Sequence, residues 1–376
     1  MVLITAGILS AVMRMKQVRT LTAAAVVAAV IFLTGSAAAA APQNSARSAV
    51  LLDASSGRVL YAKNADAQSL IASTTKIMTG LLVCEQCDLD ATFSIPPEAV
   101  GVEGSSLYLR EGQTRTVREL LYGLLLHSGN DAAVALAICC DGSVEAFVER
   151  MNARALALGL RQTHFENPSG LDAAGHGATA RELALLARAA MENRTFYKVV
   201  STPTITFDDR TYTNHNRLLW QYDGAVGVKT GYTRAAGRIL VSCAERGGQR
   251  LIAVTIDDKN DWRDHAALLD YGFAAFPLRA VLRAGQTVAA VQVIAGETET
   301  AELVTDQTLA LPLGADETAE LRIYAPPVTF APVPAGEAGR VEVWCGGEKL
   351  AERTLYVRAA VARREGKSRF ARIFGG

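Results

Sequence analysis

The sequence predicts an α/β fold in which a helical cluster is inserted into an antiparallel sheet, followed by a small all-β domain. Three observations favour this class. Strand-like stretches stand at 46–65 and again at 226–258, and helical periodicity fills the interval between them. Beyond Phe276, short Val-rich stretches of alternating polarity are punctuated by prolines, which is typical of a β-sandwich. Half of the 376 residues are hydrophobic, which is enough for a substantial core.

Residues 1–41 are expected to be an export signal rather than part of the fold. Arg14, Lys16 and Arg19 precede the apolar stretch LTAAAVVAAVIFL, and small residues follow in GSAAAAAP. A basic segment, a short apolar segment and an Ala-x-Ala cleavage site form the secretory pattern, and the apolar run is short for a membrane span. We therefore expect an exported protein.

The first strands and the helices have local sequence signals. Residues 46–65 contain an apolar stretch, a Ser-Ser-Gly turn and a second short strand, which predicts a hairpin. Thr116 and Glu119 stand at capping-box spacing before a Leu-rich helical stretch. Thr179 and Glu182 repeat that spacing before LALLARAAM.

Strands return after this helical region, and the composition then changes. VGVKTG, RILVSCAE and QRLIAVTIDD predict three strands, ERGGQ predicts a hairpin loop, and DHAALLDYGFAAF predicts a helix that packs back on the sheet. We expect a main domain at 42–277, a β-sandwich domain at 278–357 and a basic tail at 358–376.

Charge and cysteine content exclude several classes of function. Lys plus Arg equal Asp plus Glu at 38 each, so no bulk positive charge favours a nucleic-acid partner. Cys84 and Cys87 lack a second ligand pair at zinc-site spacing, and the five histidines form no cluster, so we expect neither a metal nor a cofactor. In an exported chain the cysteines either fill the core or form one helix-to-helix disulfide, and both alternatives stay open.

The segment IASTTKIMTG, residues 71–80, contains the first candidate catalytic pair. Ser73 and Lys76 are three residues apart at the start of a predicted helix, so the hydroxyl and the amine share a face. A serine becomes nucleophilic when a base takes its proton, and a lysine can do so when burial lowers its pKa. Taken alone, the spacing fits better a serine N-cap beside a solvated lysine.

Two further polar segments each have a simple structural interpretation. HSGND, residues 127–131, interrupts an apolar helical pattern with Ser128 and Asn130, as a helix–helix turn would. VKTGYT puts Lys229 and Thr230 on a predicted strand, where an edge lysine is common. A lysine and a hydroxyl on one strand can also bind a carboxylate.

Together, the three segments match the Ser-x-x-Lys, Ser-x-Asn and Lys-Thr-Gly motifs of penicillin-binding proteins and serine β-lactamases. ENPSGLDAAGH, TARELALLARA and LLDYGF extend this match. From about residue 45 to 276 the chain resembles the low-molecular-mass D-alanyl-D-alanine carboxypeptidases, serine peptidase family S11, and its β module and basic tail resemble the same proteins. The resemblance implies the serine β-lactamase/penicillin-binding-protein-like transpeptidase fold. Ile71, where many relatives have proline, is a departure outside the proposed chemistry.

The resemblance also implies a reaction. A peptidoglycan stem pentapeptide that ends in D-Ala-D-Ala would lose its terminal D-alanine, and β-lactams would act as covalent inhibitors. Ser73 would attack the carbonyl between the two D-alanines, with Lys76 as general base. Ser128 would relay a proton to the leaving amine, and Asn130 would orient the substrate and Lys76.

The substrate-binding residues implied by the resemblance are Lys229, Thr230, Gly231 and Tyr232. Lys229 and Thr230 would face the terminal carboxylate, and Gly231 would allow a close approach of backbone and ligand. The backbone amides of Ser73 and Tyr232 would form the oxyanion hole.

Three competing functions stay open at this stage. The first is a class A β-lactamase, which needs a carboxylate that drives deacylation, and Glu166 stands in the corresponding part of the chain. The lactamase pattern has an Asn three residues after its Glu, whereas here Asn167 follows at once. The second is a D,D-endopeptidase, and the third is a non-enzymatic wall-binding protein.

The basic tail at 358–376 has two interpretations. Phe370, Ile373 and Phe374 stand at helical spacing among arginines, which is typical of a peripheral anchor on an anionic membrane surface. The second interpretation is a disordered basic tail. The resemblance favours the anchor, and hence a position at the extracytoplasmic face of the bacterial membrane or in the cell wall.

Overall fold

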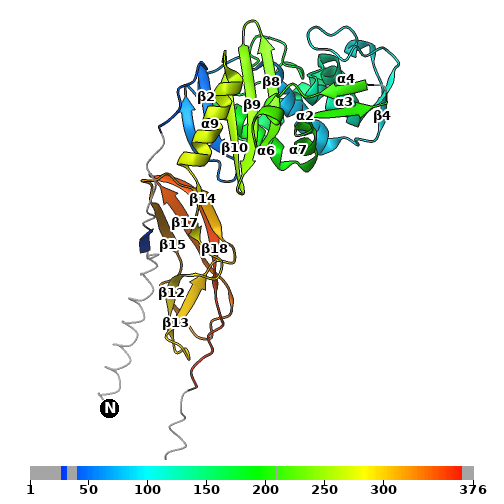
Figure 1. Cartoon of the computed structure of the whole chain (residues 1–376). Coiled ribbons are helices and arrows are strands. Elements are labelled where there is room, and N and C mark those ends of the chain that lie inside the picture. Colours follow the sequence, from blue (N-terminus) through cyan, green and yellow to red (C-terminus); the bar gives the residue numbers. More distant parts are fainter. Residues whose placement is uncertain (1–26, 32–39, 209, 366–376) are drawn as a thin grey trace, which may run out of the picture. The chain divides into compact units, whose positions relative to one another are not determined.

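The computed structural model describes residues 27–31, 40–208 and 210–365 (Figure 1). The described residues form two compact units. One contains residues 40–277, and the other contains the residues from Leu278 onward together with β1 (Val27–Ile31). Most of the predicted export signal lies outside the described residues, and β1 pairs antiparallel with β15 (Ala319–Tyr324).

The larger unit is built on an antiparallel sheet whose described strands follow the order β3-β2-β10-β9-β8. Their bounds are Ser48–Asp53 for β2, Val59–Lys63 for β3, Ala225–Thr233 for β8, Gly237–Arg246 for β9 and Gln249–Ile256 for β10. The predicted hairpin β2–β3 lies beside β10, which follows it by almost 200 residues. The prediction of one antiparallel sheet with an inserted helical cluster is therefore confirmed.

Both faces of this sheet are covered, which explains why its strands read as continuous apolar runs. Leu251 of β10 shares a small core with Leu268 and Leu269 of α9 (Asp261–Ala275). Ile252 and Val254 point to the other face and join the main core with the inserted helices. Figure 1 shows α9 alongside β9 and β10, and the helical cluster beyond the β8 edge.

The inserted region consists of helices with a few short strands. The helices are η1 (Ala72–Thr75), α2 (Lys76–Gln86), η2 (Pro97–Ala99), α3 (Val117–Leu126), α4 (Asn130–Asp141), α5 (Val144–Ala157), α6 (Ala180–Glu192), α7 (Arg194–Val200) and α8 (Leu218–Gln221). The strands are β4 (Thr92–Ser94), β5 (Thr114–Thr116), β6 (Thr204–Phe207) and β7 (Arg210–Thr213).

Both predicted helix caps are present. Thr116 Oγ1 accepts a hydrogen bond from the amide of Glu119 at 3.1 Å, and Thr179 Oγ1 accepts one from the amide of Glu182 at 3.1 Å. Each bond satisfies an amide that the first helical turn leaves without an intrahelical partner.

The apolar helical pattern breaks at HSGND, as the sequence predicted. Between α3 and α4, Ser128 has a left-handed backbone with φ of 66°, which an α-helix cannot contain. Neither Ser128 nor Asn130 caps the new helix, because the N-cap residue is Gly129 and its cap has no side-chain hydrogen bond. The break instead presents two polar side chains.

A disulfide decides between the two alternatives for the cysteines. Cys87, directly after α2, is bonded to Cys140 in α4, 53 residues along the chain. Cys84 and Cys139 lie outside this disulfide as partly buried thiols, and Cys243 is buried in the sheet. The disulfide joins the helix that begins at Lys76 to the helix that begins at Asn130.

Replacing Cys140 by serine is expected to lower the free energy of unfolding by about 2–4 kcal/mol, because a cross-link over some 50 residues removes about 4 kcal/mol of loop entropy from the unfolded chain. Urea unfolding of the oxidised protein measures this loss. Cys139→Ser, which changes the neighbouring thiol, is the control and should shift stability by less than about 1 kcal/mol. Equal unfolding midpoints for Cys140→Ser and the wild type would contradict the expectation.

The smaller unit is all-β, as predicted. Its main sheet has, among the described strands, the order β1-β15-β17-β18-β13-β12-β16, and β11 pairs with β14 separately. The strands not yet given are β11 (Leu278–Leu282), β12 (Thr287–Ile294), β13 (Thr300–Val304), β14 (Leu309–Pro312), β16 (Val328–Phe330), β17 (Gly336–Cys345) and β18 (Glu348–Val357).

Main-chain pairing in this unit continues beyond the predicted boundary at residue 357. The amide of Arg358 donates to Glu302, Val361 exchanges hydrogen bonds with Val333, and the amide of Arg364 donates to Ala295. Val361 is buried, so an apolar side chain fixes this segment to the β unit. The remainder of the predicted tail, residues 366–376, lies outside the described residues.

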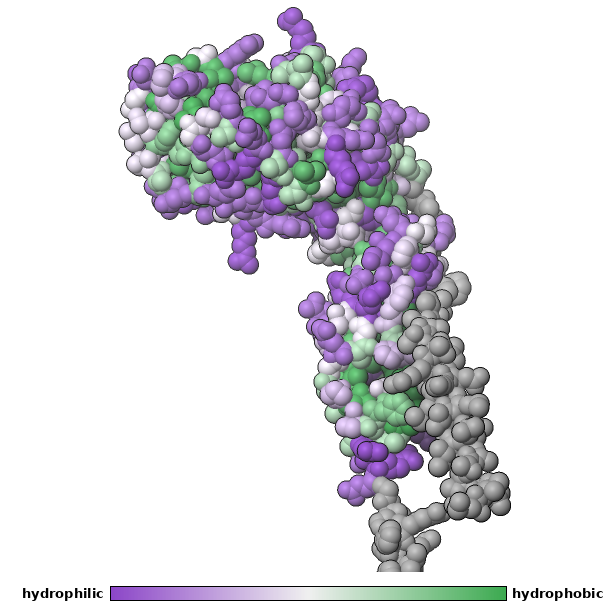
Figure 2. Space-filling model, turned by 180° about the vertical axis from the view of Figure 1, so that it is seen from behind, coloured by the Kyte–Doolittle hydropathy of each residue, from purple (hydrophilic) through white to green (hydrophobic). Residues whose placement is uncertain are grey.

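The surface of the described residues is mixed in polarity. Hydrophilic residues are interspersed with smaller hydrophobic patches on the face seen in Figure 2. Within the described residues, no helix has both the length and the hydropathy that a bilayer crossing requires.

Candidate active site

The three polar segments meet at the β8 edge of the sheet. Lys76 Nζ, at the start of α2, lies 2.9 Å from Ser73 Oγ on η1 and 2.7 Å from Asn130 Oδ1 at the start of α4. Lys229 Nζ on β8 lies 3.1 Å from Ser128 Oγ in the α3–α4 break. Segments that are far apart in the sequence therefore form one polar cluster.

The amine of Lys76 is completely buried. Ile77, Met78 and other apolar residues that follow Lys76 on α2 belong to the main core. Desolvation lowers the pKa of Lys76 well below its usual value, the nearby charge of Lys229 lowers it further, and the carboxylate of Asp131 opposes this shift. The alternative of a solvated lysine beside a serine N-cap is wrong.

Three acceptors surround this amine. Besides Ser73 and Asn130, the main-chain carbonyl of Ser169 lies 2.5 Å from Lys76 Nζ. A neutral amine has two N–H donors and one lone pair. If Asn130 Oδ1 and the Ser169 carbonyl, which can only accept, take the two donors, the lone pair faces the hydroxyl of Ser73. This arrangement suits removal of the serine proton.

A neighbouring loop fixes the orientation of the Asn130 amide. Its Nδ2 donates to the carbonyl of Glu103 at 2.5 Å, which leaves Oδ1 to face Lys76. Gly104, next to this carbonyl, has φ of 91°, and a Cβ atom there would lie 2.6 Å from Asn130 Nδ2. The glycine thus allows the loop to approach the amide this closely.

Lys229 forms the second polar pair of the site. Its Nζ donates to Ser128 Oγ and to the carbonyl of Thr230, at 3.1 and 2.9 Å. The side chain is almost fully buried, and desolvation lowers the pKa of Lys229 to about 7. Its charge therefore changes near neutral pH.

Gly231 brings β8 close to the turn that carries Ser73. A Cβ atom at Gly231 would lie 3.3 Å from the amide nitrogen of Ser73 and 3.2 Å from that of Thr74. A larger residue would push the strand and the turn apart. The amides of Ser73 and Tyr232 thus come from segments that approach each other at a glycine.

A cavity of about 880 Å³ opens on this cluster. Five of the predicted site residues line it, namely Ser73, Ser128, Thr230, Gly231 and Tyr232. The other predicted residues, Lys76, Asn130 and Lys229, are buried. Hydroxyls therefore face the cavity, and two of the three polar side chains behind them, Lys76 and Lys229, are hydrogen-bonded to those hydroxyls.

Sequence patterns did not predict part of the cavity wall. Arg238 lines the cavity. Its Nε and Nη2 atoms form a bidentate contact with the carboxylate of Asp261, at 2.8–3.0 Å. Trp220 and Trp262 also line it. Strand and helix patterns predict the elements that carry these residues, but not the direction in which a single side chain points.

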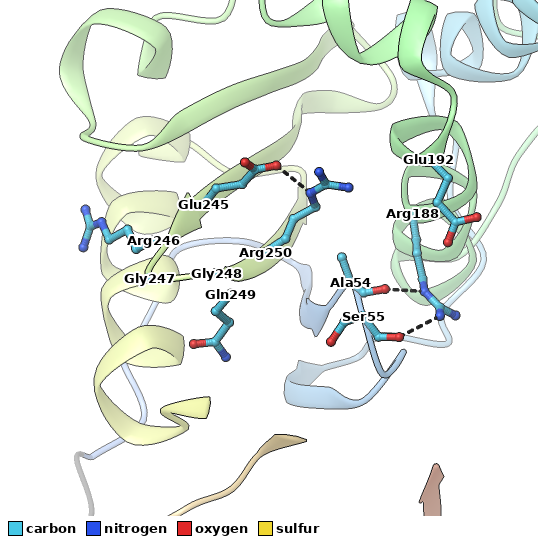
Figure 3. A pocket seen from close by; sticks show the side chains of 10 residues that line it. All are labelled: Ala54, Ser55, Arg188, Glu192, Glu245, Arg246, Gly247, Gly248, Gln249 and Arg250. Carbon is cyan, nitrogen blue, oxygen red and sulfur yellow. Dashed lines mark hydrogen bonds and ion pairs between the residues drawn. The ribbon is translucent and has the colours of Figure 1, made fainter. Parts of the chain in front are cut away.

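A second cavity, of about 410 Å³, has different chemistry. Figure 3 shows its lining residues, which come from the β2–β3 turn, the end of α6 and the β9–β10 hairpin. Arg250 is paired with Glu245 at 2.6 Å, and Arg188 donates to the carbonyl of Ala54 at 2.6 Å. The ten residues drawn there include no lysine beside a serine, so this cavity lacks a nucleophile and base of the kind described above.

A serine hydroxyl beside a buried lysine with a lowered pKa is typical of enzymes that transfer acyl groups through serine. Comparison with known proteins gives the family. The family described as D-alanyl-D-alanine carboxypeptidase matches residues 35–260, and the C-terminal domain of penicillin-binding protein 5 matches residues 276–363. The chain therefore belongs to the D-alanyl-D-alanine carboxypeptidase family. It is a serine hydrolase that removes the terminal D-alanine from stem peptides ending in D-Ala-D-Ala.

Individual relatives agree with this family. The D-alanyl-D-alanine carboxypeptidase DacF of Bacillus subtilis is 36% identical over 281 residues, which cover 71% of this chain and 72% of DacF. DacD of Escherichia coli is 38% identical over 282 residues, covering 71% of this chain and 73% of DacD. The structure of penicillin-binding protein 5 from Haemophilus influenzae aligns with a TM-score of 0.72 and 29% identity, over 86% of this chain and all of that one.

Proposed function

We propose that Ser73 is the nucleophile of the carboxypeptidase reaction and that Lys76 is its general base. Ser73 Oγ attacks the carbonyl carbon between the two terminal D-alanines, while Lys76 takes the hydroxyl proton. The peptide C–N bond breaks, D-alanine leaves as the free amino acid, and the stem peptide stays on Ser73 as an ester. Water then hydrolyses this ester, with Lys76 again as base, and Ser73 recovers its proton. The observation that carries the proposal is the buried Lys76 amine, 2.9 Å from Ser73 Oγ.

Ser128 and Asn130 are proposed to complete the acylation step. The hydroxyl of Ser128 passes a proton to the leaving nitrogen, so the proton that Lys76 gains is balanced by the one that D-alanine takes away. The hydrogen bond from Lys229 to Ser128 supports this relay. Asn130, whose amide is fixed between Glu103 and Lys76, orients both the base and the bound peptide.

The remaining predicted residues are proposed to bind the substrate. Lys229 and Thr230 bind the terminal carboxylate, since Thr230 lines the cavity and the buried amine of Lys229, next to it on β8, contacts the cavity-lining Ser128. The amides of Ser73 and Tyr232 stabilise the oxyanion of the tetrahedral intermediate. The close approach of the two segments at Gly231 supports this pairing of amides.

A class A β-lactamase finds no support in the surroundings of Glu166. Its carboxylate bonds to His164 at 3.0 Å, its side chain is 42% exposed, and Glu166 is not among the described residues that line the cavity. A deacylating carboxylate would have to face the cavity, within reach of the water that attacks the ester.

Ser73→Ala is expected to abolish covalent labelling by a fluorescent penicillin and to lower D-alanine release from a pentapeptide by about 10³-fold or more, because no other group forms the ester. Peptide mapping of the labelled wild type should find the adduct on Ser73. Ser105→Ala changes another serine of the same cavity and should keep the label. Release of D-alanine by Ser73→Ala at the wild-type rate would refute the proposal.

The KM for a peptide ending in D-Ala-D-Ala is expected to rise as the pH increases above about 7. Burial lowers the pKa of Lys229 to about 7, so its amine is charged below that pH and loses the charge that attracts a carboxylate above it. Steady-state kinetics between pH 6 and 9 measure the change. A peptide with a C-terminal amide lacks the carboxylate and should show a flat KM. An equally flat KM for the acid peptide would contradict the role of Lys229.

We also propose that the protein is exported and held at the outer face of the membrane by its tail. The signal pattern and the basic, aromatic segment at 366–376 support this location, and both depend on sequence alone.

Deleting residues 366–376 should move the protein from the membrane pellet to the soluble fraction of lysed cells. The deletion leaves the pairing of Val361 and Arg364 in place, so the β unit stays intact. Replacing Phe370, Ile373 and Phe374 by serine keeps the basic charges and tests the apolar contribution separately. Unchanged pelleting of the deleted protein would refute the anchor.

A further inference from the structure

The loop that supplies the Ser169 carbonyl is organised by one asparagine. Asn167 Oδ1 accepts hydrogen bonds from the amides of Gly170 and Leu171, at 2.7 and 3.2 Å, and from Ser169. Gly170 has φ of 87°, and a Cβ atom there would lie 1.9 Å from the carbonyl oxygen of Ala72. The loop therefore lies directly against the turn that carries Ser73.

His176 connects this loop to the residue that precedes Lys76. The amide of Glu166, where the loop begins, lies 3.0 Å from His176 Nδ1, and His176 Nε2 lies 2.7 Å from Thr75 Oγ1. The imidazole is buried, with 3% exposure. Phe165 packs edge-on against the ring at 5.8 Å.

These contacts define the tautomer of His176. A main-chain amide can only donate, so Nδ1 accepts from Glu166 and carries no proton. The proton is then on Nε2, which donates to the hydroxyl of Thr75. Burial lowers the pKa of His176 to about 4, against the opposing charges of Glu166 and Asp172, so the ring stays neutral over the physiological pH range.

We propose that His176 is a positioning residue that holds the Ser169 carbonyl against Lys76 and thereby aims the Lys76 lone pair at Ser73. The proposal rests on the roles proposed above for Ser73 and Lys76. Without the carbonyl, one N–H of the amine loses its acceptor, and the amine can turn its lone pair away from the hydroxyl. His176 itself touches neither substrate nor nucleophile; it acts through the loop.

A second contact limits the size of the effect. Thr79 Oγ1 donates to the carbonyl of Pro168 at 2.7 Å, so this bond still joins the loop to α2 when the contact between His176 and Thr75 is lost. We therefore expect a displaced carbonyl rather than a detached loop. Misplacement by about 1 Å costs a reaction step on the order of 10²-fold.

The test compares variants on both sides of the contact. Thr75→Val removes the acceptor of the His176 proton while keeping the side-chain volume, and His176→Asn keeps an acceptor near Glu166 but does not reach Thr75. Both should slow acylation by a fluorescent penicillin about 10- to 100-fold and lower kcat for the peptide, with KM changed less than about threefold.

Two further variants are controls. Thr75→Ser, which restores the hydroxyl, should recover most of the rate. His164→Ala, at the exposed side of Glu166, should acylate like the wild type.

The pH profile separates positioning from a purely structural role. The Ser169 carbonyl stabilises the charged form of Lys76, so its displacement lowers the pKa of Lys76 further, and the acid limb of the acylation profile should move to lower pH in Thr75→Val. A structural defect would lower the whole profile without moving it. Circular dichroism melting curves report the folded fraction by which each rate is normalised.

Wild-type acylation rates in both Thr75→Val and His176→Asn would overturn the proposal, and so would a lowered profile that does not move along the pH axis. If Thr75→Val does not fold, His176→Asn decides. The failure of the proposed function is distinguishable, because it would leave Ser73→Ala labelled by penicillin. A Ser73→Ala protein without label, together with wild-type rates in both Thr75→Val and His176→Asn, would remove only the role of His176.

Discussion

The burial of one lysine amine is the constraint on which the rest of this site depends. Lys76 lies at the start of a helix that is buried as far as Val83, so its amine is removed from water together with the core residues that follow it. A buried ammonium is costly, and the group responds by losing its proton more readily. A neutral amine then needs acceptors for its two N–H groups, and Asn130 and the Ser169 carbonyl provide them from two separate segments. The burial that places Lys76 in the core thus also lowers the pKa of its amine, as the proposed role of general base requires.

The fold can be understood as the support that brings these segments together. The helical insertion supplies η1, α2 and the α3–α4 break, whereas the sheet supplies β8 with Lys229 at its edge. The disulfide between Cys87 and Cys140 fastens α2 to α4, and these are the helices that begin at Lys76 and Asn130. The two lysines are close enough that the charge of Lys229 lowers the pKa of Lys76.

Most elements of this fold could be predicted from the sequence, because short stretches of residues carry the signals for caps, strands and helix breaks. The caps at Thr116 and Thr179, the strands around Lys229 and the break at Ser128 all follow from residue type and spacing. The carbonyls of Glu103 and Ser169 could not be predicted, because every residue has a carbonyl and only the tertiary fold decides where it points. The pairing of Val361 with Val333 was missed for a related reason: a single apolar residue in a basic segment gives no periodic signal. The sequence likewise could not decide between core cysteines and a disulfide, because that depends on how close the end of α2 lies to Cys140 in α4.

Ser128 illustrates a cost that the proposed catalytic arrangement imposes on the fold. Its backbone has φ of 66°, a conformation that glycine and asparagine adopt more easily and that costs another residue on the order of 1 kcal/mol. The hydroxyl that contacts Lys229 requires a serine here nonetheless. The position is therefore one at which stability and activity favour different residues: a glycine would relax the chain and remove the hydroxyl together. Selection for thermal stability alone would favour glycine at this position and remove the contact with Lys229. Stabilising substitutions therefore have to be made at other positions of the chain.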